Sequence, residues 1–178
     1  MSLLPISIYP DPVLRRKATR IENIDDEEIQ VLIDNMIETM HEAPGIGLAA
    51  NQVGRPVRLV VLDLECREPG HGLLVLINPE LISASGKTKS EEGCLSIPGY
   101  FSPVTRYEQV EVRGQDREGK VIEIEAGGLL AICLQHEMDH LEGKLFIDRM
   151  SALSRDIFKR RWKKKLKEEG EQEQPCLD

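Results

Sequence analysis

The sequence contains no apolar run near the roughly 18 residues that span a bilayer. It starts without the basic segment of an export signal. Its four cysteines are widely scattered and form no CxxC pair, so the spacing suggests neither a disulfide framework nor a zinc ribbon. Internal repeats are also lacking. We therefore expect one globular domain in a reducing cytoplasm, without a membrane partner.

Charge is unevenly distributed along the chain. The net charge of -8 argues against general nucleic-acid binding. Residues 155–167 nevertheless hold eight Lys or Arg against one acid, while Phe158, Trp162 and Leu166 recur at helical spacing. This pattern predicts a basic helix over residues 151–168, followed by an acidic, disordered tail over 169–178. The helix either packs on the preceding domain or docks onto ribosomal RNA or protein, and both interpretations stay open.

Apolar periodicity predicts a mixture of helices and antiparallel strands. Asp26 caps a helix reaching residue 42, and a second helix starts after Gly127-Gly128 and stops at Gly143. Residues 58–64 and 73–77 have the composition of buried strands, and 109–124 that of a hairpin. Regular βαβ alternation is missing. The sequence therefore predicts an α+β fold, with antiparallel sheets packed around the second helix.

The second helix carries the pentad His136-Glu137-Met138-Asp139-His140. Two imidazoles four residues apart lie on one helix face and can bind one metal ion, with Glu137 placed to work on its water. The same five residues can also occur on a helix that binds no metal, with a histidine in the core and the charged residues at the surface. If a metal is bound, a third ligand is needed for catalysis. The pattern indicates a buried hydrolytic site.

Several residues compete for the third position. Phe146 stands where one protease class has a histidine, which excludes that class. Asp148 and Asp156 are the downstream carboxylates, and a salt bridge or turn is the simpler role for Asp148. Cys94 is the better candidate because it lies in a tight Gly- and Pro-bounded segment, whereas Cys133 has the pattern of an inert buried thiol.

Three motifs together resemble those of the peptide deformylases: Gly45–Gly54 (GIGLAANQVG), Glu92–Ser96 (EGCLS) and Gln135–His140 (QHEMDH). The resemblance covers most of residues 5–150 and implies a catalytic domain over residues 1–150. It implies a metallohydrolase that removes the N-formyl group from N-formylmethionyl nascent polypeptides and releases formate. It further implies a bacterial cytoplasmic enzyme, and we expect a monomer.

The resemblance also implies a role for each matched residue. Cys94, His136 and His140 would hold one Fe2+ ion, which zinc, nickel or cobalt can replace; from residue types alone, zinc suits the set. Glu137 would move the proton, while the Gln52 amide and the Leu95 backbone N–H would stabilise the formyl oxygen. The substrate would contact the following residues: Ile46, Gly47, Gly93, Ile132 and Cys133.

Two other functions remain alternatives. A metalloprotease cleaving internal peptide bonds would need only the His136–His140 pentad. A non-catalytic ribosome-binding protein would need only the fold and the basic helix. Intact Glu137 and Gln52 argue against the second, and the lack of a protease-type third ligand argues against the first.

Overall fold

The computed structural model describes residues 2–172, with side chains to residue 168. Its elements, with two sheets and three α-helices, confirm the expected α+β fold. In chain order these are η1 (Pro12–Arg15), α1 (Glu27–Glu42), β1 (Gly47–Ala49), η2 (Ala50–Val53), β2 (Leu59–Asp63), β3 (Leu73–Ser85), β4 (Thr88–Cys94), β5 (Ile97–Arg106), β6 (Gln109–Gln115), β7 (Val121–Gly127), α2 (Gly128–Leu141), η3 (Phe146–Arg149) and α3 (Ala152–Gln172).

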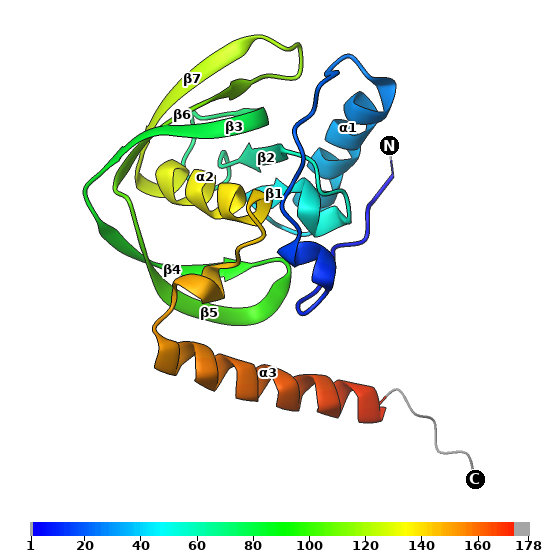
Figure 1. Cartoon of the computed structure of the whole chain (residues 1–178), viewed down its shortest axis with the longest axis vertical. Helices are drawn as coiled ribbons and strands as arrows, with labels where there is room; N and C mark the ends of the chain where they lie inside the picture. Colours follow the sequence, from blue (N-terminus) through cyan, green and yellow to red (C-terminus); the bar gives the residue numbers. More distant parts are fainter. Residues whose placement is uncertain (1, 173–178) are drawn as a thin grey trace.

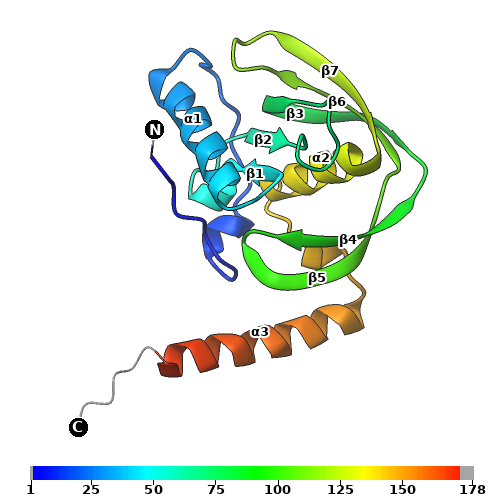
Figure 2. The ribbon, with the colours of Figure 1, turned by 180° about the vertical axis from the view of Figure 1, so that it is seen from behind.

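The larger sheet has the order β1-β2-β3-β6-β7, and every neighbouring pair is antiparallel. Strand β2 is apolar on both faces because helices cover both: Val60 and Leu62 belong to the α2 side, Leu59 and Val61 to the α1 side. Strands β4 and β5 form a separate hairpin. Helix α2 lies between the larger sheet and this hairpin (Figure 1), and the view from behind agrees (Figure 2).

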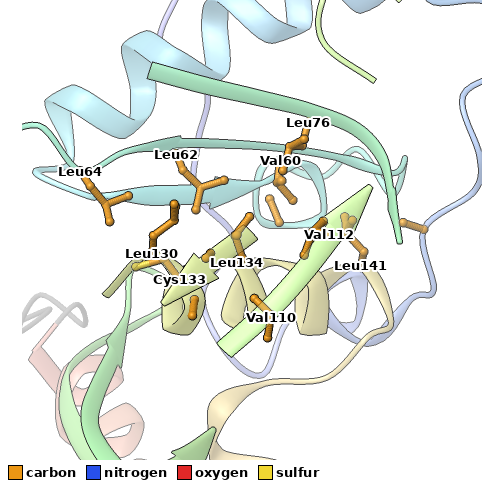
Figure 3. Packing of buried hydrophobic residues seen from close by; sticks show 14 residues of the cluster. Val60, Leu62, Leu64, Leu76, Val110, Val112, Leu130, Cys133, Leu134 and Leu141 are labelled. Carbon is orange, nitrogen blue, oxygen red and sulfur yellow. The ribbon is translucent and has the colours of Figure 1, made fainter. Parts of the chain in front are cut away.

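The core between the larger sheet and α2 explains why the motif helix is apolar on several sides. Leu130, Leu134 and Leu141 of α2 pack against strand residues such as Leu62 and Val112 (Figure 3). Burying a side chain of this size stabilises the fold by about 1.5–3 kcal/mol. The predicted central helix is therefore held rigidly beneath the sheet, and its residues His136 and His140 contact β4 of the hairpin.

Helix α3 packs on the body through two aromatic residues. Phe158 and Trp162 are buried in a cluster with Ile97 and Phe146. The Trp162 indole N–H donates to the Tyr9 carbonyl at 2.9 Å. Leu166, the third apolar residue of the predicted stripe, is 40% exposed. The packing interpretation of the basic helix is thus supported through Trp162, while its outer face stays basic.

The boundary between basic helix and acidic tail differs from the prediction. Helix α3 continues to Gln172, so residues 169–172 of the expected tail are helical. Glu and Gln are good helix formers, and extending an existing helix costs far less than nucleating one. The rest of the predicted tail, residues 173–178, lies outside the described residues. None of the helices between residues 2 and 172 is long and apolar enough to cross a membrane.

Candidate metal centre

Helix α2 places three polar motif residues in the interior. His136, Glu137 and His140 are 9%, 5% and 1% exposed. The imidazole ring centroids of His136 and His140 are 5.1 Å apart, as expected for residues one helical turn apart. Burying three polar side chains costs free energy unless each has a partner or a ligand. Their burial is the first sign of a functional site.

Cys94 reaches these histidines from the β4–β5 hairpin. The strand register shifts between Glu92 and Cys94, just before the turn into β5. The Cys94 Sγ lies 3.3 Å from the His140 Nε2. Ligand atoms of Cys94, His136 and His140 all lie within 4.8 Å of one another. A tetrahedral ion with typical metal–sulfur and metal–nitrogen bonds separates such atoms by roughly 3.5 Å, so the donor set fits a single ion.

The other buried cysteine behaves differently. Burial, with the nearby Glu137 charge, raises the pKa of Cys133 to about 12, so this thiol stays protonated. A protonated thiol is a poor metal ligand. Its position in the core between α2 and the larger sheet matches the expectation of an inert thiol.

A carboxylate orients one of the two imidazoles. The Glu92 Oε2 lies 2.9 Å from the His136 Nδ1, which leaves the Nε2 of His136 for a metal. Burial opposes ionisation of Glu92, but hydrogen bonds from Arg106 and His136 lower its pKa to about 2. For His140, burial and the neighbouring His136 lower the pKa well below its usual range, which favours the neutral, ligating form.

Glu137 is a buried carboxylate next to His136 on α2. Burial raises its pKa to about 7, against the opposing effect of His136 and Arg106. Its Oε2 is buried without a hydrogen-bond partner among the described residues. Gly47 explains how the carboxylate fits, because a Cβ at this position would lie 2.5 Å from the Glu137 Oε1. A buried carboxylate with one unpaired oxygen beside a metal site can take a proton from a bound water.

Gln52 proves to be a buried residue, although its sequence context resembles that of a turn residue at the surface. Its Oε1 accepts the Ala49 backbone N–H at 2.9 Å. This bond fixes the amide orientation, so the Nε2 faces the Ser96 Oγ at 3.2 Å and the Cys94 Sγ at 3.5 Å. An oriented N–H donor next to the metal ligands can stabilise negative charge on a substrate oxygen.

The remaining predicted substrate contacts come from the elements that carry these residues or from the segments next to them. Leu95 follows Cys94 directly, and its side chain lies against the Cα of Gly45. Gly47 is the first residue of β1, and Ile46 directly precedes it. Gly93 belongs to β4. Ile132 is partly exposed on α2, one residue before Cys133.

Sequence reasoning missed three contributors. It gave no role to Glu92 or Arg106, although Glu92 stands inside a matched motif two residues before Cys94. It also gave no role to Phe101. The structure instead places the Phe101 ring over the Cα of Gly93, with Phe101 64% exposed at the rim of the site.

The competing ligand candidates have other partners. Asp148 forms an ion pair with Arg15 and accepts the Leu145 backbone N–H at 2.8 Å. Phe146 stacks against His136, with ring centroids 6.1 Å apart. Asp156 lies on the exposed side of α3. Within the described part of the chain, Cys94, His136 and His140 form the one cluster whose donor atoms could share an ion.

Comparison with known proteins agrees with this geometry. The polypeptide deformylase family matches residues 3–156. The chain belongs to this family. A peptide deformylase from Syntrophobacter fumaroxidans is 62% identical over 168 residues, which cover 94% of this chain and 98% of that protein. One from Thermodesulfovibrio yellowstonii is 54% identical, with 93% and 99% covered.

Solved deformylase structures share the fold. The peptide deformylase of Legionella pneumophila has a TM-score of 0.87 at 42% identity, covering 98% of this chain and 100% of that one. That of Synechococcus elongatus, solved with actinonin, has a TM-score of 0.79 at 48% identity, covering 84% and 81%. The family consists of metal-dependent hydrolases that remove the N-formyl group from nascent polypeptides. Membership excludes both alternatives considered from the sequence, the protease and the non-catalytic protein.

Proposed function

We propose that Cys94, His136 and His140 hold a divalent metal ion and that Glu137 moves the proton while the formyl group is removed. The observation that carries this proposal is the convergence of three donor atoms within 4.8 Å beside the buried Glu137 carboxylate. When bound, the metal supplies the positive charge that makes water a nucleophile at neutral pH. Glu137 accepts a proton from the attacking water and later donates it to the departing amine.

The formyl oxygen gains negative charge as the carbonyl carbon is attacked. We assign its stabilisation to the Gln52 Nε2 and the Leu95 backbone N–H. The fixed amide of Gln52 supports this role because it needs no reorientation during the reaction. Removing one donor of this kind typically lowers kcat by about 100- to 1000-fold.

We propose that the substrate is an N-formylmethionyl polypeptide bound in extended form along β1. This strand is at one edge of the larger sheet, and a free edge can pair with an extended peptide. Ile46, Gly47 and Gly93 would pair with the substrate backbone. Ile132 and Cys133 would line the pocket for the methionine side chain, where their apolar character supports the assignment.

We propose ferrous iron as the physiological ion, with zinc, nickel or cobalt as substitutes. One thiolate and two imidazoles can bind several first-row divalent ions, so availability of the metal decides occupancy as much as affinity does. The residue types support a transition metal over calcium or magnesium, which prefer oxygen ligands.

The activity test uses full-length protein loaded anaerobically with iron. A formyl-Met peptide and its acetyl counterpart are the substrates, with free amine and formate measured. We expect formate from the first peptide and almost no product from the second. Glu137→Gln should keep the metal and lose most turnover, while Cys94→Ala should weaken metal binding. Cys66→Ser is the matched control, because Cys66 is an exposed cysteine outside the site.

Two results would contradict this proposal. Metal-loaded protein that releases no formate would overturn the activity, and full turnover by Glu137→Gln would remove Glu137 as the base. If Cys94→Ala and Cys66→Ser retain metal equally, Cys94 is not a ligand.

We also propose that α3 contacts the ribosome in the bacterial cytoplasm, where nascent chains emerge. The exposed basic side chains of α3 support this contact, because a local positive surface attracts RNA even on an acidic protein. Changing both Arg160 and Lys163 to Glu should weaken co-sedimentation with ribosomes without altering cleavage of a short peptide. The control changes Lys87 and Lys120 to Glu, which gives the same net charge at exposed positions in the β3–β4 and β6–β7 connections. Equal loss in both variants would contradict a specific role for α3.

A further inference from the structure

A line of four charged side chains leads from the candidate metal centre, past Asp139 of α2, to Arg149 of η3. Glu92 contacts His136, Arg106 contacts Glu92, Asp139 contacts Arg106, and Arg149 contacts Asp139. The first three are at most 9% exposed as side chains, while Arg149 is 41% exposed. Arg149 is the last residue of η3, which connects the region after α2 to α3.

Two of the links along this line are two-pronged, and the link between Arg106 and Asp139 is a single hydrogen bond. Arg149 binds both Asp139 oxygens, with Nε–Oδ2 at 2.5 Å and Nη2–Oδ1 at 2.6 Å. The Arg106 Nη1 donates to the Asp139 Oδ2 at 2.5 Å. The Nε and Nη2 of Arg106 bind the Glu92 oxygens at 2.7 and 2.8 Å. Two-pronged guanidinium–carboxylate pairs fix orientation as well as position.

The charges of the line balance only with Arg149 present. Glu92 and Asp139 carry two negative charges, and Arg106 supplies one positive charge for both. Without Arg149 the buried set would hold one uncompensated negative charge, which is costly in the interior. Arg106 would then be drawn toward Asp139, and its hold on Glu92 would weaken.

The orientation of His136 depends strongly on Glu92. A metal-binding histidine usually donates its second ring N–H to an acceptor that fixes the ring. The His140 Nδ1 is buried without such a partner among the described residues, whereas the His136 Nδ1 contacts Glu92. Any loosening of Glu92 is therefore transmitted to the one imidazole that the protein orients through an acceptor.

We propose that Arg149 is a positioning residue for the metal centre, acting through Asp139, Arg106 and Glu92 on His136. This proposal rests on the ligand set proposed above. Its chemical effect is slower metal loss, because a ring held in one orientation rebinds the ion before the other ligands release it. Arg149 makes no contact with the ligands in this account and takes no part in the reaction itself.

The test measures metal loss from the nickel-loaded, full-length protein into excess chelator. Arg149→Met should lose metal roughly 3- to 10-fold faster than wild type, less than the 10- to 100-fold typical of direct partners of a ligand. Arg149→Lys keeps the charge but not the two-pronged bond. Its rate of metal loss should lie between those of wild type and Arg149→Met. Arg113→Met is the control, because Arg113 is also half exposed and pairs with Glu123 on the β6–β7 hairpin. The visible spectrum of cobalt-loaded protein should change in Arg149→Met and not in the control.

A double variant tests the route. Asp139→Asn alone and Asp139→Asn with Arg149→Met should lose metal at the same rate, because Arg149 acts through Asp139. If the two substitutions increase the rate of metal loss independently, so that their effects multiply in the double variant, the route through Asp139 is wrong. If Arg149→Met loses metal at the wild-type rate, the proposal is wrong. If Arg149→Met does not fold, Arg149→Lys decides it by faster or unchanged metal loss. A wild-type protein that binds no metal would refute the ligand set itself, whereas normal metal binding by wild type and Arg149→Met alike refutes this inference alone.

Discussion

The burial of Glu137 predicts that this carboxylate destabilises the metal-free fold. Its pKa rises from an ordinary 4.5 to about 7, mainly through burial. Between these values the folded state binds more protons than the unfolded state. The free energy of unfolding should therefore fall as pH rises from 4.5 to 7, and stay lower above 7. Glu137→Gln removes this effect with little change in shape.

The magnitude follows from the size of the pKa change. A change of one pKa unit corresponds to about 1.4 kcal/mol, so the full effect is about 3 kcal/mol. Most of it develops between pH 5 and pH 8, where the stability gained by Glu137→Gln should increase by about 2.5 kcal/mol. The midpoint of thermal unfolding of Glu137→Gln should exceed that of wild type at both pH values. For a chain of this length, the excess should be about 5–10 °C larger at pH 8 than at pH 5.

Urea unfolding of chelator-treated wild type and Glu137→Gln at both pH values measures this difference. Comparing the two proteins at each pH cancels the titration of groups that do not interact with Glu137. The packing difference between Glu and Gln also cancels, since it is the same at both pH values. Bound metal should shrink the gain, because a nearby cation favours the Glu137 carboxylate. A gain independent of pH would refute the reasoning, as would a larger gain at pH 5.

Three further outcomes are expected. Gly47→Ala should keep the metal but lower kcat by about 100-fold or more, because the new Cβ displaces the Glu137 carboxylate; unchanged kcat would show that this contact is unimportant. In the metal-loaded enzyme, kcat/KM should rise with pH as Glu137 ionises, with a midpoint below the value of about 7 for the metal-free site; a midpoint above 7 would assign the titration to another group. Phe158→Ala should lower the free energy of unfolding, measured with urea, by about 3–5 kcal/mol. Leu153→Ala, at a position 70% exposed on the same helix, should lower it little. Equal losses would contradict the packing of α3.

The periodic parts of the molecule were predictable from the sequence. Apolar spacing placed the first helix over residues 26–42, and α1 spans Glu27–Glu42 with Asp26 as its cap. The strand pair over 58–64 and 73–77 was also confirmed, although β3 runs on to Ser85. The helical spacing of His136 and His140 predicted their shared face. These features depend on neighbours along the chain, which a sequence displays directly.

The β4–β5 hairpin was not predicted, because its local signals oppose strand formation. Strand β5 contains Pro98, Gly99 and Pro103, and β4 is largely polar. Its pairing depends on contacts across the turn and against α2. The orientation of Gln52 by Ala49 and the pairing of Arg106 with two distant carboxylates depend on tertiary contacts too. Residue identity alone cannot reveal such contacts, and only the resemblance to a family pointed to Gln52.

The stack of aromatic rings beneath the metal centre has a consequence for how the enzyme matures. Phe146 packs against His136, Tyr100 against both Phe146 and Phe158, and Phe158 against Trp162. The last two rings belong to α3, which follows α2 and its histidines in the chain. During synthesis the proposed metal ligands Cys94, His136 and His140 therefore leave the ribosome before Phe158 and Trp162. A newly made molecule can therefore complete this aromatic stack only after α3 has also been translated.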